Sequence, residues 1–226
     1  MKLALLLPGF LDSPDYAHLM TFEKRLKELG YTVDRLDACN LWSTGNTSIY
    51  TITNYLKQIE ERISFYKNQN PEEIILIGHS LGGLVSIIAG NRIDSVTSVV
   101  SLCSPGDIVN LAKKWQGSNP KHSERDLPDS IHQMKSFEIP YTFVEDGLQY
   151  SAIKEVKELQ KPIMIFIALG DKSVLPQETE KIIVEAHNPY VVRKDMEHNF
   201  RYSLKDCEIV MEEIEKFLTN RTTLNI

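Results

Sequence analysis

The sequence predicts an α/β fold in which an open, mostly parallel β-sheet of about six strands is covered by helices on both faces. Short apolar runs typical of buried strands recur along the chain, and segments with helical periodicity lie between them. Strands that alternate with helices favour parallel pairing with right-handed crossovers. The predicted strands are residues 3–7, 32–36, 74–77, 96–102, 163–168 and 190–193.

Three helices are predicted from apolar residues that recur three and four positions apart. In residues 16–29 this stripe ends just before Gly30, which occupies the position expected of the first residue after a helix. Residues 49–66 carry a longer stripe, with Pro71 beyond its end. Residues 204–218 form the last predicted helix.

Residues 104–159 interrupt the alternation of strands and helices. The segment is polar, contains four prolines and shows only local helical periodicity, at 107–115 and 150–159. It is too long for an ordinary loop, and its aromatic residues argue against disorder. We therefore expect a single domain over residues 1–226, with 104–159 forming a small cap insertion above the carboxyl ends of the strands.

Composition narrows the possible partners and location. A net charge of −6 on 226 residues argues against nucleic acid or an anionic membrane as the main partner. The three widely spaced cysteines, Cys39, Cys103 and Cys207, suggest neither a disulfide framework nor a zinc site, and they favour a reducing compartment. The apolar run 3–7 is too short for a signal peptide core, and no run is long enough to span a membrane. We expect a cytoplasmic protein, monomeric or homodimeric, with no cofactor and no metal.

The segment Gly78-His79-Ser80-Leu81-Gly82 lies between a predicted strand and an apolar helix. A serine on such a tight turn projects its hydroxyl group above the sheet in a strained backbone conformation. Glycine at 78 and 82 avoids steric collision with the neighbouring chain, and the N-terminus of the following helix favours negative charge near the serine. Ser80 is therefore the candidate nucleophile; the alternative is a purely structural Gly-Ser turn.

A serine nucleophile needs a histidine base that is oriented by a carboxylate. His198 and Asp171 both follow late strands, so both are expected at the same edge of the sheet as Ser80. Asp107, after the strand at 96–102, is the alternative acid. His187 is expected at the opposite edge, and His122 and His132 in the cap.

Two further histidines and the first loop complete the candidate residues. His79 is expected to pack beneath the turn, while His18 is a weak candidate for substrate contact. An oxyanion hole would use the N–H groups of Leu81 and of Phe10, in the loop Pro8-Gly9-Phe10-Leu11-Asp12. The candidate substrate-binding residues are Leu11, Trp42, Trp115 and Tyr150, each of which could equally belong to the core.

Taken together, the segments PGFLDSP, GHSLGG, LGDKS and MEHNF resemble the α/β-hydrolase superfamily, and in particular its small carboxylesterases and its monoacylglycerol-lipase-like and cinnamoyl-esterase-like enzymes. The resemblance implies a three-layer α/β-hydrolase fold from which the two N-terminal strands of the family are absent. It also implies a pocket shaped by the cap. One departure is Pro8 before Gly9, where many relatives have histidine.

The resemblance and the residues predict a serine hydrolase that cleaves carboxylic esters of small molecules through an acyl-enzyme intermediate. Ser80 would attack the carbonyl carbon, His198 would act as base and then acid, and Asp171 would orient His198. Thioesters or amides could react by the same machinery. The alternative is a non-catalytic scaffold of the same fold that serves as a binding or interaction protein.

Overall fold

One parallel sheet forms the centre of the molecule. The computed structural model describes residues 1–115 and 119–223. Six strands lie in the order β2-β1-β3-β4-β7-β8, and every neighbouring pair is parallel, which confirms the predicted sheet. The strands are β1 (Lys2–Leu7), β2 (Tyr31–Arg35), β3 (Glu73–His79), β4 (Ser98–Leu102), β7 (Ile163–Ala168) and β8 (Tyr190–Lys194).

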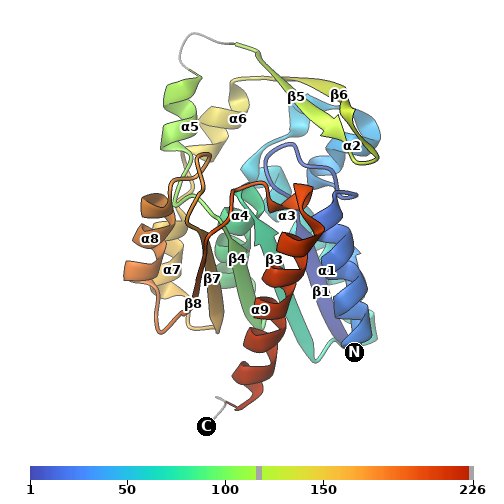
Figure 1. The fold of residues 1–226 in the computed structure, drawn as a ribbon, viewed down its shortest axis with the longest axis vertical. Helices are drawn as coiled ribbons and strands as arrows, with labels where there is room; N and C mark the ends of the chain where they lie inside the picture. The colour runs from blue at the N-terminus through green and yellow to red at the C-terminus, as the bar shows by residue number, and fades with distance from the viewer. Residues whose placement is uncertain (116–118, 224–226) are drawn as a thin grey trace.

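The alternation of side chains along each strand divides the core into two apolar clusters. On β1, Leu3, Leu5 and Leu7 pack in one cluster, whereas Ala4 and Leu6 pack in the other. The first cluster contains residues of α3, α4, α7 and α8, and the second contains residues of α1 and α9. Figure 1 shows α1 and α9 crossing one face of the sheet, so the fold has three layers. The helices around the sheet are α1 (Ala17–Glu28), α2 (Leu41–Thr44), α3 (Ile52–Tyr66), α4 (Leu81–Arg92), α8 (Pro176–Glu185) and α9 (Leu204–Thr223).

The second predicted helix begins later than expected. The chain forms a separate 3₁₀ turn at Thr47–Ile49, and α3 then starts at Ile52. Thr51 is extended, and its side chain accepts a hydrogen bond from the N–H of Asn54, which caps the helix. The apolar spacing runs through both elements, so periodicity alone did not show the break between them.

The segment between β4 and β7 contains a β-hairpin that the sequence did not indicate. Strands β5 and β6 pair antiparallel, and most of their side chains are at least partly exposed. Their charged residues gave no apolar alternation, so only helices were expected there. In Figure 1 the hairpin lies beyond the end of the sheet at which the strands terminate. The elements of this cap are α5 (Val109–Lys114), β5 (Lys121–Leu127), β6 (Ser130–Ile139), α6 (Thr142–Gly147) and α7 (Ala152–Glu158).

Neither a membrane-spanning helix nor a disulfide occurs in the part of the chain that the structure describes. Within those ranges, no helix is both long enough and apolar enough to cross a membrane. Cys39, Cys103 and Cys207 are all buried free thiols, and burial raises the pKa of each of them. They are therefore held as neutral side chains in the core.

Candidate active site

Ser80 lies at the turn between β3 and α4, in a backbone conformation that L-residues seldom adopt. Its φ is 54° and its ψ is −117°. The turn is tight because two glycines let backbone segments touch: a Cβ on Gly78 would lie 2.1 Å from the carbonyl oxygen of Gly82. A Cβ on Gly82 would lie 2.1 Å from the carbonyl oxygen of Leu7. The turn therefore aims the serine hydroxyl away from the sheet, as a nucleophile requires.

The three side chains at Ser80, His198 and Asp171 form one hydrogen-bonded chain. His198 Nε2 lies 3.1 Å from Ser80 Oγ, and His198 Nδ1 lies 2.5 Å from Asp171 Oδ2. The other oxygen of Asp171 accepts the backbone N–H groups of Ser173 and Val174, each at 2.8 Å. Because the carboxylate accepts from Nδ1–H, Nε2 is left without a proton and accepts from the serine hydroxyl. Hydrogen bonding of this kind is what a serine nucleophile needs in order to lose its proton.

The loop after β1 lies directly against Ser80. A Cβ on Gly9 would come within 3.3 Å of the Ser80 Cβ, so glycine permits this close approach. Leu81 is the first residue of α4, where a backbone N–H has no partner inside the helix. Among the described residues, no acceptor engages the N–H of Phe10 or of Leu81. Both groups are therefore available to a ligand oxygen next to Ser80.

Three aromatic side chains hold this loop through hydrogen bonds to its backbone. Tyr50 Oη accepts the N–H of Leu11 at 2.8 Å, and Tyr55 Oη donates to the carbonyl oxygen of Pro8 at 3.1 Å. Trp42 Nε1 donates to the carbonyl oxygen of Leu11 at 3.0 Å. These bonds hold the Pro8–Gly9 turn in place. The prediction did not include Tyr50 or Tyr55, neither of which belongs to the apolar stripe predicted in residues 49–66.

A cavity of about 400 Å³ opens above Ser80, but the four candidate substrate-binding residues do not line it. Leu11 is fully buried in the core beneath the loop, and Trp42 holds that loop from behind. Trp115 is buried against Phe10, and Tyr150 bonds to Thr53 on α3. The expected substrate contacts at these positions are corrected accordingly. The apolar part of the lining comes instead from Phe10, Leu81, Ile108, Leu111 and Val174.

Charged residues that the sequence did not single out join the cap to the floor of the cavity. Arg125 on β5 donates through Nε and Nη2 to the carbonyl oxygen of Phe10, at 3.2 and 2.9 Å. Arg201 donates to both carboxylate oxygens of Asp126, at 3.0 and 2.6 Å, and this pair is buried. Arg201 lies three residues after His198 in the sequence. A basic residue so soon after the candidate base was the sequence feature that could have marked Arg201 as part of the site.

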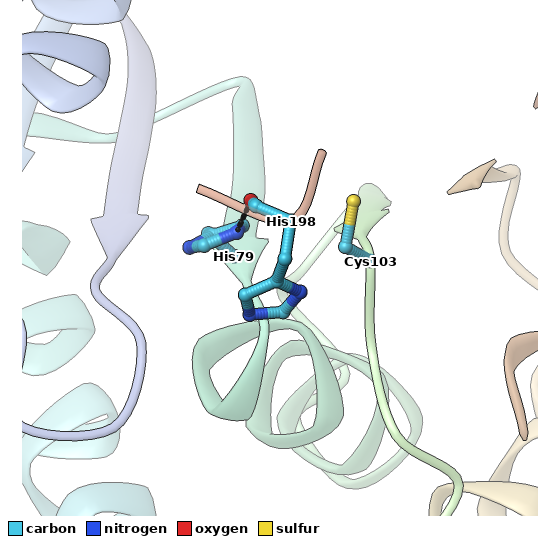
Figure 2. A group of neighbouring side chains, drawn as sticks. All are labelled: His79, Cys103 and His198. Carbon is cyan, nitrogen blue, oxygen red and sulfur yellow. Dashed lines mark hydrogen bonds between the residues drawn. The ribbon is translucent and has the colours of Figure 1, made fainter. Parts of the chain in front are cut away.

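The remaining histidines occupy different surroundings. His187 is exposed and bonds to the carbonyl oxygen of Lys157, and His122 and His132 lie on the exposed cap strands. His18 is wholly buried, so it makes no contact with the cavity and the expectation of substrate contact is corrected. His79 is also buried, and its Nε2 lies 3.1 Å from the carbonyl oxygen of His198 (Figure 2). His79 therefore helps to hold the loop that carries the candidate base.

Asp107, the alternative acid, lines the cavity, and one of its oxygens accepts the N–H of Val109 at 2.9 Å. The hydrogen bond to His198 Nδ1 comes from Asp171 instead. The geometry therefore favours Asp171 as the residue that orients His198.

Comparisons with known proteins agree with this architecture. A family model described as a PGAP1-like alpha/beta domain matches residues 40–133, which include the turn at Ser80. No curated protein is detectably similar in sequence.

Solved structures share the fold over almost the whole chain. Est1E from Butyrivibrio proteoclasticus is 18% identical with a TM-score of 0.76, over 98% of this chain and 88% of that one. Mouse alpha/beta hydrolase domain-containing protein 10 is 20% identical with a TM-score of 0.75, over 96% and 90%. The Pyrococcus furiosus esterase Pf2001 is 16% identical with a TM-score of 0.67, over 97% and 82%. The chain therefore has the three-layer fold of the α/β hydrolases.

Proposed function

We propose that this protein is a serine esterase that cleaves carboxylic esters of small molecules. The observation that carries the proposal is the hydrogen-bonded chain from Asp171 through His198 to Ser80, which lies at the floor of a cavity. Structures of esterases with the same fold support the reaction class. The proposed enzyme acts in the cytoplasm, and its free, buried thiols are consistent with a reducing compartment.

Catalysis would begin when the Ser80 oxygen attacks the ester carbonyl carbon while His198 Nε2 takes the hydroxyl proton. The resulting imidazolium would be stabilised by the Asp171 carboxylate, which is itself held by two backbone N–H groups. The N–H groups of Phe10 and Leu81 would donate to the developing oxyanion. Losing one such donor costs roughly 2.7–4 kcal/mol of transition-state stabilisation.

In the second half of the reaction, the alcohol would leave with the proton from His198 and the acyl group would remain on Ser80. A water molecule, deprotonated by the same histidine, would then attack the acyl carbon. Release of the acid would regenerate the serine hydroxyl. The reaction needs no group beyond those present in the chain.

A panel of p-nitrophenyl esters of increasing acyl length tests this function. It should include an ester of ferulic acid, because Est1E, whose fold this chain shares, has been solved with ferulic acid bound. The wild-type protein should hydrolyse at least one ester, and folded Ser80→Ala should hydrolyse none above background. A folded wild-type protein that hydrolyses no ester in the panel would instead favour a non-catalytic binding scaffold.

A further inference from the structure

Three buried polar side chains meet beside the turn that carries Ser80; Asp12 also lines the cavity, whereas His18 and His79 do not. Asp12 comes from the loop after β1, His18 from α1 and His79 from the end of β3. They are 8%, 0% and 3% exposed, respectively. One potential ligand atom from each lies within 4.8 Å of those from the other two. Three separate elements of the fold therefore direct lone pairs to one point.

Among the described residues, the ring nitrogens that face this group lack hydrogen-bond partners. His79 Nε2 donates to the carbonyl oxygen of His198, so in the neutral ring Nδ1 carries a lone pair on the side facing Asp12. Within the described part of the chain, His79 Nδ1 and both nitrogens of His18 lack a hydrogen-bond partner although they are buried. Two imidazole nitrogens and one carboxylate oxygen therefore lie close together without direct hydrogen bonds among them, and a metal ion that binds there would take the nitrogen of each ring that carries a lone pair.

The one distance that links two of these groups directly fits a shared ion better than a direct bond. His79 Nδ1 lies 3.6 Å from Asp12 Oδ2. That separation exceeds the roughly 2.7–3.2 Å of an N–H···O hydrogen bond. A histidine nitrogen about 2.0–2.1 Å and a carboxylate oxygen about 2.0–2.2 Å from one zinc ion, at the tetrahedral angle, are separated by roughly 3.3–3.5 Å, close to the observed distance. The ligand atom of His18 lies within 4.8 Å of the other two, so His18 completes a tetrahedral set after a side-chain shift of at most about 1.5 Å.

The surrounding charges leave room for a cation. Asp12 turns its other oxygen, Oδ1, toward Arg125 at 3.8 Å, so Oδ2 is free for the ion. The positive charge of Arg201 is already paired with Asp126. Gly9 also matters, because a Cβ there would lie 2.6 Å from Asp12 Oδ2 and would displace the carboxylate.

We propose that Asp12, His18 and His79 bind a single zinc ion that ties the loop after β1 and helix α1 to the turn at Ser80. Two imidazoles and one carboxylate suit Zn²⁺ and exclude the hard cations Mg²⁺ and Ca²⁺, which prefer oxygen ligands. Two of its three ligands, His18 and His79, are buried and do not line the cavity, so the role of the ion is structural. It holds Gly9 and Phe10 against the serine.

A second group of potential ligands, His79, Cys103 and His198, does not form a comparable site. Figure 2 shows His79 and Cys103 on opposite sides of His198. The two ring nitrogens of His198 already bond to Asp171 and Ser80, and His79 Nε2 already bonds to the backbone of His198. Those atoms have partners, unlike the atoms that face Asp12.

The test is a zinc titration of tag-free, chelator-treated full-length protein against a chromophoric zinc indicator, together with thermal melts. Wild type should bind one equivalent of Zn²⁺ and melt at a higher temperature when zinc is present. In His18→Phe the ring packs against Phe22 and Phe200 as before, but the ligand is gone. This variant should lose more than about 100-fold in affinity, because loss of even a residue that supports a ligand costs roughly 10–100-fold.

Asp12→Asn and His122→Ala complete the test. Asp12→Asn should weaken zinc binding in the same way as His18→Phe. His122→Ala removes an exposed histidine that lies 3.6 Å from Glu138, and it should bind zinc like wild type. The proposal is overturned if folded wild type takes up no stoichiometric zinc, which would leave water as the occupant. It is equally overturned if His18→Phe binds zinc as wild type does, or if the binding disappears in His122→Ala.

Discussion

Replacement of Asp171 by asparagine tests the role of the proposed acid without changing the shape of the site. One oxygen of Asp171 accepts two backbone N–H groups, from Ser173 and Val174. In Asp171→Asn only the amide oxygen can accept those two donors, so the NH₂ group must face His198 Nδ1. That nitrogen must then accept, which places the ring proton on Nε2, opposite Ser80. The histidine becomes unable to take the serine proton.

The expected loss follows from this wrong tautomer. An aspartate-to-asparagine change that traps the histidine in this way lowers kcat by about 10⁴-fold, which corresponds to roughly 5.4 kcal/mol of barrier. The measurement is kcat for the most reactive p-nitrophenyl ester, for wild type and Asp171→Asn. Circular dichroism and urea unfolding would establish that the variant is folded.

The matched control is Asp107→Asn, at the rival carboxylate on the wall of the cavity. Its amide oxygen can still accept the N–H of Val109, so the local turn is kept. The control should retain close to wild-type kcat. The reasoning is refuted if Asp171→Asn keeps kcat within about tenfold of wild type, or if Asp107→Asn causes the larger loss.

Three further predictions concern stability. Arg201→Met leaves the buried Asp126 carboxylate without its arginine partner, and it should lower the free energy of unfolding in urea by about 3–5 kcal/mol. A loss below about 1 kcal/mol would contradict the claim that Arg201 and Asp126 form a buried ion pair. Burial acts to raise the pKa of Asp126, but the hydrogen bonds and charge of Arg201 outweigh it and hold that pKa below its usual value. The stabilisation that this ionised carboxylate gives is therefore fully present above the unfolded pKa of about 4, and it is lost as pH falls through the folded pKa. Urea midpoints measured against pH should show this loss. The pH dependence should be absent from Asp126→Asn. Gly78→Ala places a Cβ 2.1 Å from a backbone oxygen and should lower the free energy of unfolding by about 4 kcal/mol or more in the same urea assay. The control Gly45→Ala, at φ 71° with open space around it, should lower it by about 1 kcal/mol. Equal losses of stability in the two variants would argue against the tight turn.

The sheet was predictable because its strands are buried on both faces. The runs that became β1, β3, β4 and β7 are nearly continuous in apolar residues, and such runs stand out from the segments between them. The parallel order then places the residues after each strand at one edge. The proximity of Ser80, Asp171 and His198 follows from that topology, although their distances do not.

The cap and the contacts of the loop after β1 were not predictable in the same way. Strands β5 and β6 are mostly exposed and charged, so no period of two in hydrophobicity marks them. Trp42 and Trp115 were possible substrate contacts because large aromatic residues occur both in pockets and in cores. Trp115 is buried against Phe10, whereas Trp42 is partly buried and packs against Phe137 of β6, contacts that the sequence does not show. The role of Arg201 depends on its pairing with Asp126, 75 positions away in the sequence.

The central claim is that Ser80 is a nucleophile activated by His198. Reaction with a fluorophosphonate probe, followed by intact-mass analysis and peptide mapping, measures this most directly, because the probe forms a covalent bond only with an activated serine. One adduct per chain should form and map to Ser80, and it should be absent from folded Ser80→Ala. A folded wild-type protein that forms no adduct, or a Ser80→Ala variant that is still labelled, would contradict the claim.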